Sequence, residues 1–201
     1  MSIKKFNAIL LAAGLSSRFN SEVPKQYLYL GKKQILDHSI DQIYSHKQCD
    51  LLVVVVNKYY KNIYNLNSLK DKKIKFVFGG KSRQQSVING IKSLPNSDNL
   101  LLIHDAARPG IDHSIINKLI AILEKDVSCA IPLLPQYDSL LKNEKEFNVS
   151  INRKNLFRIQ TPQVFQSNSL KLNDFSEYPD ATDESEIVVK KGKRLKTIPG
   201  K

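Results

Sequence analysis

A doubly wound α/β fold with a mostly parallel sheet and a protruding β-arm is the fold class that the sequence predicts. Apolar runs with the composition of buried strands alternate with amphipathic helical patterns along the chain. That order is typical of a parallel sheet with helices on both faces. Residues 135–160 break the alternation, because they are polar and lack a clean helical period, and they predict an extended hairpin or arm. The 201 residues suffice for one domain, 1–201, with its own core.

Each expected strand is an apolar run, and each expected helix fills an interval between two runs. "LLVVVV" at 51–56 is continuously apolar and β-branched, which is typical of a strand covered on both faces. The other expected strands are 7–12, 73–78, 99–105 and 129–134, and the expected helices are 34–46, 82–94 and 113–125. A last helix should begin after Thr182 or Asp183 as N-cap and stop at Gly192.

The net charge is +12, which raises the hypothesis of a nucleic-acid-binding module. The lysines are spread along the chain, however, and no stretch interleaves them with aromatic residues in the manner of RNA-binding segments. We therefore expect a solvated, lysine-rich surface around a site for polyanionic small molecules, and no nucleic-acid partner.

The cysteines and the apolar runs bear on the compartment. Cys49 and Cys129 lie far apart and have no metal-ligand spacing, which favours two buried thiols in a reducing environment. No apolar run approaches the roughly 18 residues of a membrane span. The apolar stretch near the N-terminus turns directly into a loop, so it favours a first strand over a signal peptide. We expect a cytoplasmic protein without a membrane partner.

Three motifs that could bind a ligand lie at the carboxyl ends of expected strands: "AAGLSSR", "GGKSRQQS" and "HDAARPG". Ligands of parallel sheets bind outside the carboxyl ends of the strands. The first motif has the small residues that let backbone N–H groups approach a phosphate. It matches neither the GxGxxG pattern nor the GxxxxGK[ST] pattern. Arg18 and Lys25 would then supply positive charge, and Pro24 fixes the backbone before Lys25.

The other two motifs suggest an anion site and a metal ligand. Ser82 is a plausible N-cap, and Arg83 and Ser86 lie on the first helical turn, where anions are favoured. Asp105, at a strand end, is a good ligand for Mg²⁺, which takes one or two protein carboxylates plus substrate phosphates. Arg108 could pair with a second phosphate or hold Asp105 in place. The alternative for this pair is an ion pair that only closes the loop.

Taken together, the motifs closely resemble those of the 2-C-methyl-D-erythritol 4-phosphate cytidylyltransferases of the non-mevalonate isoprenoid pathway. The matching segments are "AAGLSSRF", "PKQYLYLGKKQILDHSI", "GGKSRQQSVINGI", "IHDAARPGI", "RKNLFRIQTPQVF" and "ATDESEIVVKKG", in the family's order. The resemblance implies a Rossmann-like nucleotidyltransferase sheet. It also implies that a polyol phosphate attacks the α-phosphorus of CTP, giving a CDP-alcohol and pyrophosphate, with Mg²⁺ or another divalent cation as cofactor.

The resemblance further implies roles for individual residues. The CTP-binding residues would be Ala12, Ala13, Gly14, Leu15, Gly80, Lys81, Arg83, Ser86 and Ala106. The catalytic cations would be Arg18, Lys25 and Arg153. The acceptor-binding residues would be Asp105, Arg108, Ser139, Thr161 and Thr182, and Asp105 would also hold the metal. The arm would clasp a second subunit in a homodimer, so that Arg153 and Thr161 reach the acceptor phosphate in the neighbour's site.

The chain departs from the family pattern at two places. Ser16 stands where the family often has glycine, and a small residue keeps the loop slim. After "TIPGK" the family continues with an Asn-x-Lys-x-Thr motif, whose lysine helps to position the acceptor phosphate, and this sequence ends at Lys201. We therefore expect a chain truncated at its C-terminus, and a piece of a fusion with a later pathway enzyme is one form of that expectation.

Three alternatives stay open on the sequence. Ribitol-5-phosphate cytidylyltransferases share most of the pattern. A relative that binds nucleotide without turning it over would fit the missing lysine motif. A nucleic-acid-binding module would fit the charge alone, and it predicts binding that depends steeply on salt.

Overall fold

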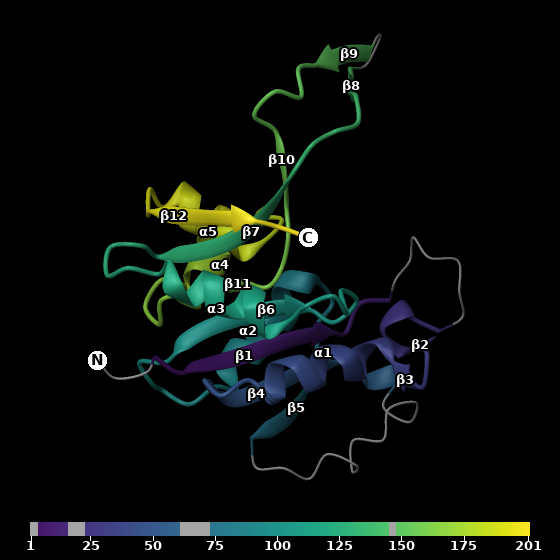
Figure 1. Ribbon diagram of the computed structural model, residues 1–201, viewed down its shortest axis with the longest axis vertical. Coiled ribbons are helices and arrows are strands. Elements are labelled where there is room, and N and C mark those ends of the chain that lie inside the picture. Colours follow the sequence, from purple (N-terminus) through teal and green to yellow (C-terminus); the bar gives the residue numbers. More distant parts are fainter. Residues whose placement is uncertain (1–3, 16–22, 61–72, 145–147) are drawn as a thin grey trace.

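The protein is described here by a computed structural model that covers residues 4–15, 23–60, 73–144 and 148–201. Its core is an eight-stranded sheet in the order β10-β7-β11-β6-β1-β4-β5, with β12 paired to β7 (Figure 1). The strands are β1 (Phe6–Ala12), β4 (Cys49–Val56), β5 (Ile74–Phe78), β6 (Leu100–Asp105), β7 (Cys129–Pro135), β10 (Phe157–Ile159), β11 (Gln163–Phe165) and β12 (Leu195–Pro199).

Most neighbouring strands of this sheet are parallel. Strands β6, β1, β4 and β5 run in one direction, and β12 is parallel to β7. Strand β11 lies between β6 and β7 and is antiparallel to both, and β10 is antiparallel to β7. The predicted mostly parallel sheet is confirmed, with β11 as an antiparallel insertion that the sequence did not indicate.

Helices cover both faces of the sheet. Helices α1 (Ile35–Tyr44) and α3 (His113–Ala121) pack on one face, and α2 (Arg83–Lys92), α4 (Asp174–Glu177) and α5 (Glu184–Lys190) pack on the other. Strand β1 shows why two cores form. Ala8 and Leu10 belong to the core beneath α1 and α3, and Ile9 between them belongs to the opposite core, because successive side chains of a strand alternate between faces. The doubly wound arrangement is thereby confirmed.

The helices are shorter than the patterns that predicted them. The pattern over 113–125 gives a helix that ends at Ala121, because Ile122 is already its C-cap and Leu123 turns into the core. At the helix starts, Ser82 accepts a hydrogen bond from the N–H of Gln85, as expected for an N-cap. None of the helices in the described ranges has the length and apolar character needed to cross a bilayer.

The last helix resolves the choice between two predicted caps. Asp183 accepts a hydrogen bond from the N–H of Glu186 at 3.1 Å, so Asp183 and not Thr182 is the N-cap of α5. Gly192 follows the helix with φ of +65°, a left-handed conformation that suits glycine at a helix end. The predicted stop is confirmed.

The described residues between β7 and β10 form the expected arm. Strands β8 (Leu140–Asn143) and β9 (Asn148–Ile151) pair with each other in a separate two-stranded sheet. Figure 1 shows this sheet projecting away from the body of the molecule, at the end of two chain segments that continue from β7 and β10. Large apolar side chains are exposed along the arm and its base: Tyr137, Leu141, Val149, Phe157 and Ile159.

Short elements connect β1 to α1 and extend β4. The segment Lys25–Tyr27 is a 3-10 helix, η1, and Lys58–Tyr60 is a second one, η2. Strands β2 (Tyr29–Leu30) and β3 (Lys33–Gln34) make a small hairpin around Gly31, which has φ of +66°. These elements place side chains beside the end of β1, where the candidate site lies.

Candidate active site

The carboxyl ends of β6, β1, β4 and β5 lie level at one edge of the sheet. The strand register pairs Leu11 with Asp105, Ala12 with Val56, and Val56 with Phe78. The loops after β1, β5 and β6 therefore start at the same edge, and the three motifs singled out in the sequence come together there.

Side chains from η1 and from the end of β4 hold the loop that follows β1. Gln26 donates from Nε2 to the carbonyl oxygens of Ala12 at 2.8 Å and Gly14 at 2.7 Å. Asn57 donates from Nδ2 to the carbonyl oxygen of Ala13 at 3.1 Å. Three successive carbonyl groups of this loop are thus tied to amide side chains.

The tied carbonyls determine where the amide groups of the loop point. In a trans peptide group the N–H is directed opposite to the C=O, so the N–H of Gly14 points away from Asn57 and the N–H of Leu15 points away from Gln26. In "PKQY" the sequence indicated Lys25 as a functional residue but not Gln26, which is 3% exposed. The sequence feature that could have indicated Gln26 is a glutamine beside an aromatic residue in a short turn. The aromatic residue, Tyr27, donates from its hydroxyl to the carbonyl oxygen of Ala12 at 3.1 Å.

The loop after β5 approaches the loop after β1 so closely that only glycine fits. A Cβ atom added to Gly79 would lie 2.4 Å from the Cβ of Ala13 and 2.8 Å from the Oγ of Ser86. Ser86 is 4% exposed. It accepts a hydrogen bond from the N–H of Gly80 at 3.2 Å and donates to the carbonyl oxygen of Ser82 at 2.9 Å. Through these two hydrogen bonds, Ser86 holds the backbone of this loop in place.

If the CTP site that the resemblance implies lies at these loops, Gly79→Ala should weaken CTP binding about tenfold, because overpacking of this size forces backbone shifts that separate the two loops. Isothermal titration with CTP measures the effect. Gly110→Ala is the matched control, since an added Cβ there meets no atom within 4 Å. Equal CTP affinities for both variants would contradict the close approach as a determinant of binding.

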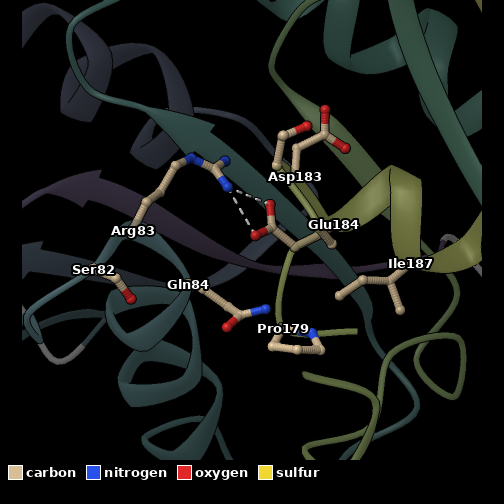
Figure 2. A pocket seen from close by; sticks show the side chains of 9 residues that line it. Ser82, Arg83, Gln84, Pro179, Asp183, Glu184 and Ile187 are labelled. Carbon is tan, nitrogen blue, oxygen red and sulfur yellow. Dashed lines mark hydrogen bonds and ion pairs between the residues drawn. The ribbon is translucent and has the colours of Figure 1, made fainter. Parts of the chain in front are cut away.

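Arg83, the first residue of α2, links the sheet edge to α5. Its Nη1 donates to both carboxylate oxygens of Glu184, at 2.8 and 3.0 Å, and its Nε donates to Oδ1 of Asp105 at 3.3 Å. Figure 2 shows Arg83 and Glu184 facing each other in a pocket of about 220 Å³ between the starts of α2 and α5. The sequence predicted Arg83 as a CTP contact but missed Glu184 as its partner.

Burial and charge act in opposite directions on this pair. Glu184 is 2% exposed, and burial raises the pKa of its carboxyl group while the Arg83 guanidinium counters that effect. For Arg83, burial disfavours the charged form, but Glu184 and Asp105 together outweigh it and raise the pKa of the guanidinium. Arg83 therefore stays charged and joins Glu184 to Asp105.

Asp105 is the carboxylate that could hold a divalent cation. Its side chain is 29% exposed, with Arg83 at 3.3 Å from one oxygen and Arg108 Nε at 3.5 Å from the other. Two long contacts leave lone pairs of the carboxylate available, so the residue fits a cation that is shared with substrate phosphates. In the part of the chain that the structure describes, no cluster of three or more His, Cys, Asp or Glu side chains is arranged to hold a metal.

His104 precedes Asp105 at the end of β6 and is fully buried. Burial lowers the pKa of His104 to about 4, so the ring is neutral. Its Nδ1 lies 3.0 Å from the Oγ1 of Thr161, and its Nε2 lies 3.0 Å from the carbonyl oxygen of Arg108.

Thr161 lies beside Asp105 of its own chain. Its Oγ1 accepts a hydrogen bond from the N–H of Asp105 at 3.2 Å, so the side chain packs against β6 of its own chain. The reason is the strand that follows, since β11 is hydrogen-bonded to β6 with Gln163 opposite Ile103.

The remaining residues predicted for the nucleotide site lie along the same edge. Leu15, Lys25 and Lys81 are exposed, whereas Ala106 is fully buried and accepts a hydrogen bond from Ser39. Arg18 and Ser16 lie outside the described residues.

Three further residues were predicted to bind the acceptor. Two of them lie on the arm, away from this edge of the sheet, and the third is hydrogen-bonded within its own segment of the chain. Ser139 and Arg153 are on the arm and exposed, and Arg153 donates to the carbonyl oxygen of Tyr137. Thr182 donates from its N–H and its hydroxyl to Glu186, at 2.7 and 3.0 Å.

Comparisons with known proteins agree with the motifs. The family model for 2-C-methyl-D-erythritol 4-phosphate cytidylyltransferase (IspD) matches residues 6–201. The bifunctional enzyme IspD/IspF of Pelagibacter ubique is 36% identical over 193 residues, which are 96% of this chain and 51% of that protein. The chain thus spans about half the length of this relative. The 2-C-methyl-D-erythritol 4-phosphate cytidylyltransferase of Shewanella halifaxensis is 37% identical over 168 residues, 83% of this chain and 73% of that protein.

A solved structure extends the likeness to the fold. The crystal structure of 4-diphosphocytidyl-2C-methyl-D-erythritol synthase from Anaerococcus prevotii superposes with a TM-score of 0.82 at 25% identity, over 98% of this chain and 88% of that chain. The doubly wound sheet, the projecting arm and the likeness to this synthase define the fold as that of the α/β nucleotidyltransferases. Since the family model covers almost the whole sequence, the chain belongs to the 2-C-methyl-D-erythritol 4-phosphate cytidylyltransferase family.

Proposed function

We propose that this chain transfers the cytidylyl group of CTP to 2-C-methyl-D-erythritol 4-phosphate, as a step of isoprenoid precursor synthesis in the cytoplasm. An oxygen of the acceptor phosphate attacks the α-phosphorus of CTP, and the bond from that phosphorus to the bridging oxygen of the β-phosphate breaks. The products are the CDP-alcohol and pyrophosphate. The convergence of the loops after β1, β5 and β6 around Asp105 is the observation that carries this proposal.

The chain contributes orientation and charge to this reaction, and it forms no covalent bond with the substrate. The amide groups of Gly14 and Leu15, aimed by the tied carbonyls, would bind the triphosphate. Lys25 and Arg18 would neutralise the charge that develops on the α-phosphate and on the leaving pyrophosphate. Arg108 would orient the acceptor beside Asp105.

A divalent cation, Mg²⁺ or one of similar size, would be held by Asp105 together with substrate oxygens. When bound, it would supply positive charge that lowers the cost of the negative charge developing on the phosphate groups. Arg83 and Arg108 flank the carboxylate, so they would limit its movement when the cation is exchanged.

The assay that tests this function is pyrophosphate release from CTP and Mg²⁺ by the 201-residue chain, with 2-C-methyl-D-erythritol 4-phosphate and ribitol 5-phosphate compared as acceptors. Release with the first acceptor supports the proposal. Release only with ribitol 5-phosphate would show that ribitol 5-phosphate, and not 2-C-methyl-D-erythritol 4-phosphate, is the acceptor. CTP binding without release with either acceptor would instead favour a nucleotide-binding protein that lacks turnover.

We also propose a homodimer in which the arm of one subunit completes the site of the other. Exposed apolar side chains such as Leu141 and Phe157 give the arm a surface suited to a partner chain. Arg153, exposed on the arm, would then reach the acceptor phosphate in the neighbouring site.

Mixing two inactive variants tests this arrangement directly. In a dimer of Lys25→Ala with Arg153→Ala, one site has both residues intact if Arg153 acts across the interface. Equal mixing should then restore about one quarter of the wild-type activity, because half of the dimers are mixed and each has one intact site. If Arg153 acts within its own chain, every site lacks one residue, and the mixture stays as inactive as its components.

A further inference from the structure

We propose that Gln26 is a positioning residue that couples Lys25 to the loop after β1. Its carboxamide would fix the distance between the amide groups of that loop and the ammonium group of Lys25, so that both meet the same triphosphate. The effect on catalysis rests on the proposed function. The hydrogen bonds that make the coupling belong to the chain itself.

The carboxamide of Gln26 uses both of its hydrogens on the loop. Its Nε2 lies 2.8 Å from the carbonyl oxygen of Ala12 and 2.7 Å from the carbonyl oxygen of Gly14. A carbonyl oxygen can only accept, so the group that faces the two oxygens must be the NH₂ of the side chain and not its C=O. Gln26 is 3% exposed, and a buried carbonyl group that loses its donor costs free energy. The two bonds therefore hold the loop against η1.

The backbone of Lys25 is held on both sides. Pro24 before it and Gln26 after it are buried, whereas Lys25 itself is exposed. The N–H of Tyr27 donates to the carbonyl oxygen of Pro24 at 2.9 Å, which closes the turn. Consecutive Cα atoms are about 3.8 Å apart, so the bonds from Gln26 to the loop also limit where the Cα of Lys25 can lie relative to the loop.

Asn57 holds the same loop to a different element. It donates from Nδ2 to the carbonyl oxygen of Ala13 at 3.1 Å, and its Oδ1 accepts from the N–H of Tyr59 at 2.9 Å. These side-chain bonds join the loop to the end of β4 and to η2, and neither involves η1. Asn57 would thus help to aim the amide groups of the loop without fixing Lys25. The two side chains therefore predict different effects: Gln26 acts on CTP affinity and on rate, and Asn57 acts on affinity alone.

Two substitutions separate these effects. Gln26→Leu removes both bonds, and we expect the single-turnover rate of pyrophosphate release at saturating CTP to fall about 10- to 100-fold, the scale of a small misplacement of reacting groups. The Kd for CTP should rise about tenfold, the scale of one net hydrogen bond. Asn57→Leu should raise the Kd for CTP by a similar factor. It should leave the rate at saturating CTP within about threefold of the wild type, because only binding is lost.

A double variant tests whether Gln26 acts through Lys25. If the carboxamide positions the ammonium group, Gln26→Leu has no ammonium group to misplace in a chain that already carries Lys25→Ala. The rate of the double variant should then match that of Lys25→Ala within about threefold. Losses that multiply would overturn the proposal, since they would show that Gln26 affects the rate independently of Lys25.

Gln48→Leu is the matched control. Gln48 donates from Nε2 to the carbonyl oxygen of Lys4 at 2.7 Å, so it makes the same kind of bond just before β4, at the opposite edge of the sheet. Its rate and its CTP affinity should match the wild type. Equal losses in Gln48→Leu and Gln26→Leu would mean that the fall in rate reports a general loosening of the fold, which would also overturn the proposal.

One measurement requires neither a variant that folds nor a substrate. Both NH₂ hydrogens of Gln26 are bonded and buried, so in the wild type they should exchange with solvent at least about tenfold more slowly than those of Gln48, which is half-buried. Equal exchange rates would show that the Gln26 bonds do not form, and the proposal would be wrong. A wild-type chain that binds CTP and releases no pyrophosphate would defeat the proposed function, while the exchange rates would still decide whether Gln26 holds the loop.

Discussion

Replacing Lys25 with alanine should lower turnover by about 10²- to 10³-fold, the effect of removing one preorganised group that stabilises developing charge. CTP affinity should fall far less, because the loop after β1 keeps its amide groups in place. Lys25 starts η1 directly after Pro24 and precedes Gln26, which is tied to that loop. Single-turnover and steady-state pyrophosphate release, with CTP titrated separately, measure the two effects. Arg18→Ala should behave in the same way.

Lys47→Ala is the matched control for this experiment. Lys47 is exposed just before β4, at the opposite edge of the sheet from the candidate site. The substitution Lys47→Ala removes one positive charge from the chain, as Lys25→Ala does. Its turnover should match the wild type. If Lys25→Ala kept a near-normal rate, the proposed charge stabilisation by Lys25 would be wrong.

Glu184→Gln should lower the free energy of unfolding by about 3 kcal/mol, because breaking a buried ion pair leaves the remaining charge poorly compensated. Glu184 is 2% exposed and receives two hydrogen bonds from Arg83. Without it, Arg83 would depend on Asp105 alone, so we also expect weaker Mg²⁺ activation. The chain contains no tryptophan, so urea unfolding is best followed by circular dichroism.

Glu186→Gln makes the same chemical change two residues later in α5. Glu186 pairs with Lys190 at 2.8 Å and is 30% exposed, and exposed pairs contribute about 1 kcal/mol or less. Its unfolding free energy should therefore fall by less than that amount. Equal losses in the two variants would show that the Arg83–Glu184 pair has no special weight in the fold.

The sequence predicted the parallel part of the sheet well because burial on both faces leaves a direct mark on composition. Strand β4, with its run of valines, has no polar face to confuse the pattern. Strand β11 left no such mark. It has three residues, Gln163–Phe165, and its place between β6 and β7 depends on contacts with strands far away in the sequence.

The candidate site shows the same division. The sequence indicated the glycines and positively charged residues of the strand-end motifs by residue type. It did not indicate which side chains form hydrogen bonds or ion pairs with them. In "DESE", Glu184 and Glu186 look alike as acidic residues of a first helical turn, yet one is buried against Arg83 and the other pairs near the surface. Which glutamate faces inward is fixed by the docking of α5 on the sheet, and local sequence does not encode it.

The insertion of β11 has a consequence for how the chain acquires its fold during synthesis. Strands β1, β4, β5 and β6 are complete once Asp105 has emerged from the ribosome, whereas the partner that covers the free side of β6 comes only with Gln163–Phe165. At about 5–20 residues per second, β6 is therefore an unpaired edge for several seconds of translation. The unpaired edge of β6 can form hydrogen bonds with strands of other nascent chains. We therefore expect the nascent chain that contains β6 but still lacks β11 to be the form most prone to aggregation and most dependent on chaperones.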